Sequence, residues 1–354
     1  MSQAQPQPLA AGILRASAPG LSGIIASRLH EEAPDAAANI GSFDSWKRHV
    51  EQHLLQLAAA LSDGAPQSFV KQILWSRDAF DARGQSVEAL DSLLDIAQET
   101  LQENVPDGKA ALTPYYDAAR AALAGVSSPD VSHLDESTPH GALATRYLAA
   151  LRAGDEPAAI EIVLGAIREE TLTTSEITHL VLVPSLREIG REWHLNRLTI
   201  AEEHFATAVT QKLLARILGQ SPASEPNGKS VLLTAASGDS HGFGIQIIAA
   251  EFELDGWRTI CLGTDMPPED LADMAALHGV DLVGIGATLD TQRQSVQASI
   301  GALRSARPEL KIIVGGQAFL GMDDTWRRCG ADEFAPTARA AVEKGRQLVG
   351  LTAS

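Results

Sequence analysis

Cysteine is scarce in this chain of 354 residues, which contains only Cys261 and Cys329. Two cysteines build neither a disulfide framework nor a thiolate metal site. Disulfides are rare in reducing compartments, so a chain with so few cysteines is consistent with the cytoplasm, and we expect a cytoplasmic location.

Basic charge is also in short supply, because 28 Lys and Arg face 45 Asp and Glu and the formal net charge is −17. Proteins that bind nucleic acids usually carry a basic surface, so we expect no direct contact with nucleic acid. The sequence shows no compact signal core and no long apolar run that would predict a membrane span.

The chain falls into blocks that are separated by segments rich in Ser, Pro, Asp and Gly. The first residues contain an early arginine and many small side chains and lack the compact apolar core of a secretory signal, so they are expected to form a flexible tail. We expect, in chain order, a flexible tail over residues 1–41, a helical domain over 42–135, a four-helix bundle over 142–220 and an α/β domain over 229–354.

The last block has the clearest pattern. Four short apolar runs of strand length, at residues 230–236, 258–263, 280–287 and 311–316, alternate with amphipathic helical stretches. This alternation predicts βαβ units and a parallel sheet. Ligands of such sheets bind beyond the carboxyl ends of the strands, so the residues that follow each strand are the candidates for a site.

The first strand is followed by Asp239-Ser240-His241-Gly242-Phe243-Gly244. An imidazole here points into the ligand crevice, and a carboxylate two residues earlier can bond its second ring nitrogen and fix its tautomer. Glycines remove side chains where a bulky ligand approaches the backbone. Taken alone, an Asp-x-His pair also occurs in ordinary surface turns.

The spacing Asp239-x-His241-x-x-Gly244 resembles the signature of the cobalamin-binding domain shared by methionine synthase, corrinoid methyl-carrier proteins and CarH-type photoreceptors. The resemblance implies that His241 is the lower cobalt ligand and that the nucleotide tail of the cofactor inserts into a flavodoxin-like sheet domain. It also implies that Gly315, Gly316 and Phe319, after the fourth strand, line this tail.

One segment departs from the family pattern. The family usually has Ser-x-Leu after the third strand, with the serine bonded to the tail, whereas this chain reads Gly286-Ala287-Thr288-Leu289. Thr288 is the expected source of a hydroxyl in its place.

The helical bundle resembles the cap of a complete cobalamin module. Trp193 and the pair Glu203-His204 give the spacing Trp-x9-Glu-His, which resembles the adenosyl pocket of CarH-type photoreceptors. The same resemblance implies that His194 becomes the upper cobalt ligand after light. The alternative is that Trp193 is a core residue and that Glu203-His204 is a polar helix face.

The N-terminal block does not look like a DNA-binding domain, because residues 1–135 hold nine Lys and Arg against seventeen Asp and Glu. A helical domain placed ahead of such a cap resembles the globin-like domain of the photocobilins, which bind cobalamin and biliverdin. Without a cysteine in this block, a bilin is held non-covalently. Its expected pocket residues are Trp46, His49, His53, Trp75, Tyr115 and Tyr116. A helical protein-interaction domain is the alternative.

Together these observations predict an α plus α/β protein with an all-helical domain, a four-helix cap and a sheet domain. The expected function is light sensing, without enzymatic activity, through adenosylcobalamin and a possible biliverdin. We expect a homo-oligomer whose state changes with light and that acts on an effector protein. The alternatives are a corrinoid methyl carrier that serves a methyltransferase and a cobalamin-binding antirepressor.

Overall fold

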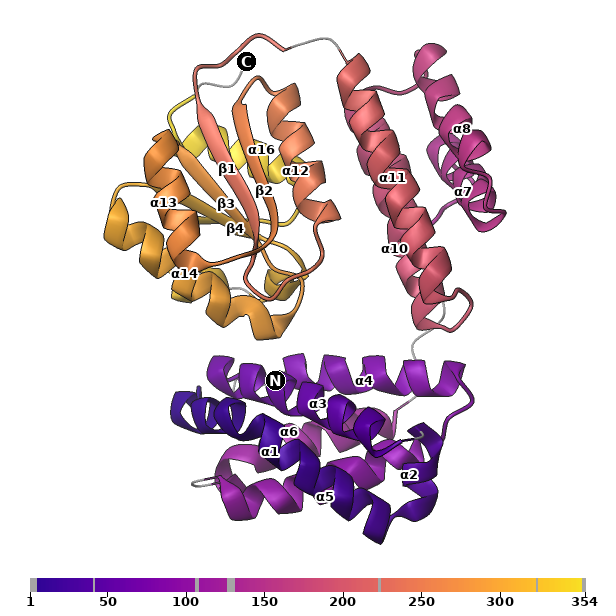
Figure 1. Ribbon diagram of the computed structural model, residues 1–354, viewed down its shortest axis with the longest axis vertical. Helices are drawn as coiled ribbons and strands as arrows, with labels where there is room; N and C mark the ends of the chain where they lie inside the picture. Colours follow the sequence, from indigo (N-terminus) through magenta and orange to yellow (C-terminus); the bar gives the residue numbers. More distant parts are fainter. Residues whose placement is uncertain are drawn as a thin grey trace. The chain divides into compact units, whose positions relative to one another are not determined.

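The computed structural model describes residues 5–40, 42–105, 108–125, 131–221, 224–322 and 324–351 (Figure 1). The chain forms two compact units. The first unit comprises Met1–Asp130 together with His194–Arg197, and the second comprises Val131–Trp193 and Leu198–Ser354.

The first unit is helical. Its helices are α1 (Pro8–Glu32), α2 (Pro34–Ile40), α3 (Phe43–Asp63), α4 (Pro66–Ala82), α5 (Glu88–Asn104) and α6 (Gly108–Leu123). The Ser42 hydroxyl caps α3 by accepting a hydrogen bond from the Ser45 amide, and Gly64 ends the same helix in the left-handed conformation. The helices expected between residues 43 and 125 are therefore confirmed.

Helix α1 corrects the expectation of a flexible tail over residues 1–41. It buries Leu14, Ile25 and Leu29 in the core of the first unit and packs along α3. Its apolar residues lie on all sides and many are alanine, so the sequence shows no amphipathic period. By length and composition alone, α1 is also the one helix among the described residues that could cross a membrane.

The second unit begins with the expected bundle. Its elements are α7 (Pro139–Arg152), α8 (Glu156–Arg168), α9 (Thr174–Ile177), the π-helical turn η1 (Thr178–Leu182), α10 (Val183–His194) and α11 (Ile200–Gln220). The sequence predicts one continuous helix where α9, η1 and α10 follow one another. In η1 the Val183 amide bonds the Thr178 carbonyl, immediately before Pro184, which has no amide hydrogen to donate.

A five-stranded parallel sheet forms the rest of this unit, in the order β2-β1-β3-β4-β5. The strands are β1 (Ser230–Ala236), β2 (Arg258–Met266), β3 (Leu282–Gly286), β4 (Lys311–Gly315) and β5 (Glu333–Ala335). Four of them match the predicted runs. The three-residue β5 was not predicted, because it is too short to show a period.

Helices cover both faces of the sheet (Figure 1). They are α12 (Phe243–Leu254) and α16 (Ala338–Leu348) on one face, and α13 (Pro268–His278) and α14 (Arg293–Ala306) on the other. The short segments η2 (Asp290–Gln292), η3 (Gln317–Phe319) and α15 (Thr325–Arg328) lie in the connections. Helix α16 was not predicted from the sequence.

The strand order reverses between β1 and β3, because α12 leads from β1 outward to β2 and α13 leads back to β3. At this point the chain leaves the two neighbouring strand ends in opposite directions and opens a crevice. The loops after β1 and β3 therefore face a ligand site.

The bundle and the sheet domain share a core. Ile247 and Ala250 of α12 and Ala338 of α16 belong to the same buried cluster as the bundle residues. The Ser175 hydroxyl also donates to the buried Glu251 carboxylate of α12, at 3.1 Å. The second unit thus behaves as one packed body.

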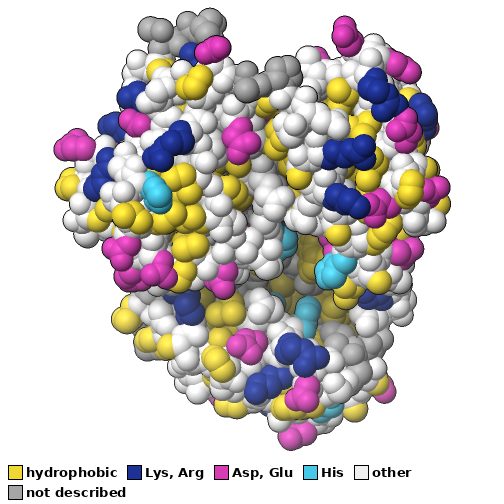
Figure 2. All heavy atoms as spheres, turned by 45° about the horizontal axis from the view of Figure 1, so that its top comes forward, with side chains coloured by type: hydrophobic (Ala, Val, Ile, Leu, Met, Phe, Trp, Pro, Cys, Tyr) yellow, Lys and Arg dark blue, Asp and Glu magenta, His cyan; other side chains and the backbone are white. Residues whose placement is uncertain are grey.

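Charges of both signs alternate over the face drawn in Figure 2, where Lys and Arg are interspersed with Asp and Glu among the described residues. This surface agrees with the negative net charge of the chain. A basic stripe of the kind that binds phosphate backbones is not present on that face.

Gly316 offers a test of how tightly the ends of β3 and β4 are packed. Its φ is +97°, and a Cβ there would lie 2.2 Å from the Ala287 carbonyl oxygen. Gly321 has a similar φ of +75° but no atom within 4 Å of such a Cβ. We expect Gly316→Ala to lower the free energy of unfolding by about 1 to 3 kcal/mol more than Gly321→Ala does, measured by denaturant titration. Equal losses for the two variants would show that the β3–β4 loops adjust freely.

Candidate corrinoid site

The loop between β1 and α12 presents His241 at the crevice. Its Nδ1 lies 2.8 Å from Oδ1 of Asp239, and its backbone amide donates to the same oxygen at 2.9 Å. The His241 side chain is 59% exposed, whereas Asp239 is 1% exposed. A buried carboxylate thus holds an exposed imidazole by one ring nitrogen and leaves Nε2 for a ligand.

Asp239 also ties the loop after β1 to the loop after β3, because its Oδ2 accepts the Thr288 amide at 2.8 Å. Burial raises the pKa of Asp239, but the hydrogen bonds from His241 and Thr288 outweigh burial and hold this pKa below its usual value. The hydrogen bond to Asp239 in turn raises the pKa of His241, against the effect of burial. Asp239 is therefore an anion that orients the ring.

Two residues that the sequence analysis did not single out support this loop. Asp265, near the carboxyl end of β2, accepts the Gly238 amide at 2.8 Å. Buried Gln292 donates to the Gly238 carbonyl at 3.2 Å, and its side-chain oxygen accepts the Thr288 and Leu289 amides. The place of Asp265 at a strand end was a signal for its role, whereas nothing in the sequence indicated Gln292.

The other residues of the motif surround the imidazole. Ser240 and Gly244 are exposed, and a Cβ on Gly244 would meet no atom within 4 Å. A Cβ on Gly242 would meet Thr264 Cγ2 at 2.9 Å. Phe243 is partly buried against the bundle core, so it lies where the sheet domain meets the cap.

Thr288 follows β3, and its amide donates to Oδ2 of Asp239 at 2.8 Å. It therefore helps to hold the carboxylate that orients His241. Phe319 packs in the core on the α13–α14 side of the sheet, beside Phe334. Gly315 and Gly316 follow β4, with Gly315 paired to Gly286 of β3.

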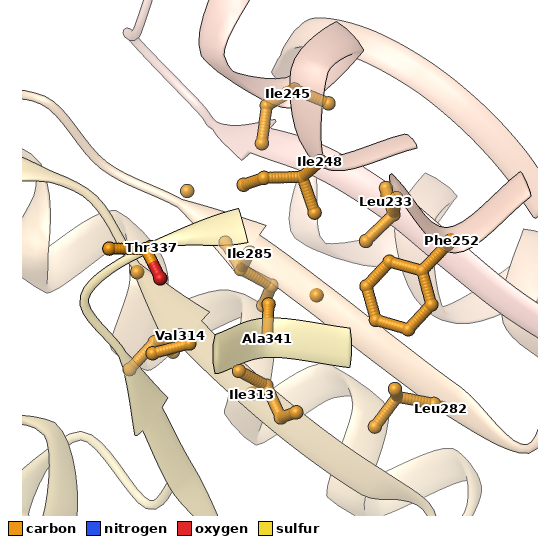
Figure 3. A pocket seen from close by; sticks show the side chains of 14 residues that line it. Leu233, Ile245, Ile248, Phe252, Leu282, Ile285, Ile313, Val314, Thr337 and Ala341 are labelled. Atoms are coloured by element: carbon orange, nitrogen blue, oxygen red, sulfur yellow. The ribbon is translucent and has the colours of Figure 1, made fainter. Parts of the chain in front are cut away.

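A cavity of about 30 Å³ lies between the sheet and the helices α12 and α16. Figure 3 shows the side chains of Ile245 and Ile248 across it from Ile313, with Thr337 at one side. Thr337 is the one polar side chain among its lining residues. Its hydroxyl caps α16 by accepting the Ala340 amide. The cavity is therefore apolar and well suited to a flat aromatic group, although it is too small to hold one unless side chains move.

Three residues of the helical bundle were also predicted to belong to the site, namely Trp193, Glu203 and His204. Trp193 is partly buried against the bundle core. Glu203, in the first turn of α11, accepts the Thr207 hydroxyl at 2.9 Å and lies 2.5 Å from Nδ1 of the exposed His204. The negative charge of Glu203 contributes to the raised pKa of His241. Glu203 of the cap and His241 of the sheet domain therefore face a common space.

His194 has its partners in the first unit. Its ring stacks on Trp75 of α4, with ring centroids 4.3 Å apart and an interplanar angle of 22°. Burial lowers the pKa of His194, the Asp78 charge opposes this, and the Arg83 charge lowers it further. We therefore expect a neutral ring at pH 7.

Comparison with known proteins identifies both parts of the second unit. Residues 229–345 match a model described as B12 binding domain, and residues 143–218 match a second model with the same description. The second unit therefore carries both parts of a B12-binding module, and this chain is a corrinoid-binding protein.

Three known proteins are similar to this corrinoid-binding protein. It is 28% identical over 204 residues to a corrinoid protein of Desulfitobacterium hafniense (strain Y51), and the aligned residues cover 56% of this chain and 93% of that protein. It is 26% identical over 172 residues to the HTH-type transcriptional repressor CarH of Myxococcus xanthus, over 48% of this chain and 56% of the repressor. The solved structure of the Methanosarcina barkeri monomethylamine corrinoid protein superposes with a TM-score of 0.50 at 18% identity, covering 57% of this chain and 96% of that one. This last likeness supports the fold.

The residues fit a corrinoid. The donor is a single imidazole whose second nitrogen is anchored by a buried carboxylate, which is the arrangement of a metal-ligating histidine. The apolar cavity lined by Gly286 and Gly315 would admit the aromatic end of the nucleotide tail only after its side chains move. His241 would hold the cobalt from below, and Glu203 would border its upper face.

The aromatic residues expected to bind a bilin fall into separate groups. Trp46, His53, Tyr115 and Tyr116 are buried in the core of the first unit. Trp46 lies edge-on to His49, and the His53 ring lies against Tyr116 with centroids 6.1 Å apart. Trp75, by contrast, is 48% exposed.

Burial sets the protonation of the two histidines of α3. It lowers the pKa of His49 to about 4 and the pKa of His53 to about 3, with the His49 charge adding to the second shift. Both rings are therefore neutral near pH 7. Their contribution to the free energy of unfolding should be constant above pH 6.5, where the histidines are neutral in both states. It should decrease as the pH falls below 6.5, because the histidines of the unfolded chain then bind protons that the buried rings do not.

The lower-ligand assignment predicts a spectroscopic change in two variants. We expect His241→Ala to lose the absorbance of a histidine-ligated cobalt when the protein is titrated with aquocobalamin. Asp239→Asn should weaken binding by about 10- to 100-fold, because the ring loses its anchor. His278→Ala, at the end of α13, is the control for removing an imidazole from this domain. Unchanged spectra and affinity in His241→Ala would disprove the assignment.

Proposed function

We propose that this corrinoid-binding protein is a light sensor that uses adenosylcobalamin and is not an enzyme. The observation that carries the proposal is that the charge of Glu203 in the cap acts on His241, while Trp193 packs against the bundle core. A carrier of methyl groups needs the imidazole of His241 but does not require Trp193, Glu203 and His204. The similarity to a transcriptional repressor named CarH gives independent support.

The residues have separate tasks in this proposal. When bound, adenosylcobalamin would supply a cobalt–carbon bond that light breaks, and the loss of the adenosyl group would leave an open position for a protein ligand. His241, oriented by Asp239, keeps the cofactor attached from below before and after light. Trp193, Glu203 and His204 form the pocket of the adenosyl group. The neutral ring of His194 offers a nitrogen to the open position, and imidazole is a good ligand for cobalt.

The rival proposals rest on other similarities. Relatives named as corrinoid proteins, among them the dimethylamine corrinoid protein of Methanosarcina barkeri at 25% identity over 183 residues, favour a methyl carrier. An antirepressor that binds cobalamin is the second rival. We propose that the protein is a homo-oligomer whose state changes with light, that it signals to a protein effector, and that it contacts neither nucleic acid nor a membrane.

Illumination separates these functions. We expect the protein loaded with adenosylcobalamin in darkness to lose the adenosyl group in light and to acquire the spectrum of cobalt with two imidazole ligands. His194→Ala should still photolyse but lack this final spectrum, whereas His278→Ala, on α13, should retain it. The oligomeric state, measured by light scattering before and after light, should change in the wild type and in His278→Ala but not in His194→Ala. A spectrum that is identical in His194→Ala and wild type would reject the role of His194.

We further propose that the first unit binds biliverdin without a covalent bond. His49 and His53 are neutral imidazoles among aromatic rings, and a linear tetrapyrrole needs such contacts together with cations for its carboxylates. Arg77 is buried beside Asp78, and its Nη1 atom has no hydrogen-bond partner among the described residues. This guanidinium can meet a propionate.

Mixing the protein with biliverdin tests this second chromophore. We expect structured far-red absorbance that survives a desalting column and is released by denaturation, because the first unit offers no thiol for attachment. Arg77→Gln should lower the affinity, and Lys109→Gln, which removes an exposed positive charge on α6, should not. Biliverdin that passes the column unbound would leave the first unit as a protein-interaction domain.

A further inference from the structure

The stacked pair of Trp75 and His194 has a geometry that the proposed function does not explain. The two rings come from α4 and from the end of α10, and they lie nearly parallel at 4.3 Å. Nδ1 of His194 is buried without a hydrogen-bond partner. Arg83 donates from Nη1 to the His194 carbonyl oxygen at 2.9 Å, so the backbone is held as well as the ring.

The surroundings of the two cobalt-ligand candidates differ. The charged groups that act on His194 are Asp78 and Arg83, both of the first unit. Those that act on His241 are Asp239 and Glu203, both of the second unit. In this structure His194 therefore belongs to the first unit, although Trp193 beside it belongs to the second.

Trp75 itself calls for an explanation. It is 48% exposed on a helix whose inner face is formed by residues such as Phe69 and Ile73. It is thus not required to fill the core. Its ring contact with His194 is the one recorded for it among the described residues.

We propose that Trp75 is a positioning residue that retains His194 in the first unit until the upper cobalt position opens. The inference rests on the proposed role of His194. When the ring nitrogen displaces water at cobalt, the water is released and the imidazole leaves the indole face. The first unit then loses the stacking contact between Trp75 and His194. The packing around Trp75 thus depends on the ligand state of the cobalt.

The expected size follows from the contact. A stacked aromatic pair contributes about 0.5 to 1.5 kcal/mol, which corresponds to a change of about 2- to 10-fold in the equilibrium between the two positions of His194. Removing the indole should favour ligation by this factor. Retaining an aromatic face should preserve most of the restraint.

Aquocobalamin in darkness gives a test that needs no photolysis. The full chain is loaded with it, and the absorbance change from water to imidazole at the upper position is followed in time and at equilibrium. We expect Trp75→Ala and Arg83→Ala to form the product about 2- to 10-fold faster or more completely than the wild type. Trp75→Phe should resemble the wild type, as should Lys71→Ala, which changes an exposed side chain one turn earlier on α4.

The outcomes distinguish the two proposals. If His194→Ala abolishes the absorbance change but Trp75→Ala matches the wild type, Trp75 does not retain the ring and the inference is wrong. A slower change in Trp75→Ala would also overturn it, because the indole would then present the ring to cobalt. If His194→Ala leaves the change intact, the role of His194 in the proposed function fails, and the inference fails with it.

Discussion

The buried charge of Asp239 is the constraint on which the corrinoid site depends. A carboxylate out of water is stable only when hydrogen bonds replace its hydration. Here the donors are the amide and ring of His241 and the amide of Thr288. The same bonds join the loops after β1 and β3 and aim the imidazole. The hydrogen bonds that stabilise this edge of the sheet therefore also orient the His241 imidazole.

The division of the chain gives a second constraint. The bundle and the sheet domain share a core through α12 and α16, so they form one unit around the corrinoid site. The boundary with the first unit falls inside α10, between Trp193 and His194. The His194 ring stacks on Trp75, whereas Trp193 packs against the bundle core. A helix end in this position can couple ligand exchange to a change in packing.

Particular elements show how far local pattern carries. The strands β1, β3 and β4 were predicted because each is a continuous apolar run that ends in glycine or small polar residues. Helix α1 was missed because apolar residues surround it and no period is visible. Strand β5 was missed because three residues pair with β4 only after the rest of the sheet exists.

The sequence by itself determined the hydrogen bond between Asp239 and His241, because the two residues are two positions apart in one loop and their contact does not depend on distant parts of the chain. It also determined the order of the bundle and sheet elements, whose periods are local. Only the tertiary structure decided that the Thr288 amide bonds Asp239 and that Gln292 supports the loop. It also decided that His194 stacks on Trp75. These contacts join residues far apart in the chain, and packing rather than local propensity brings such residues together.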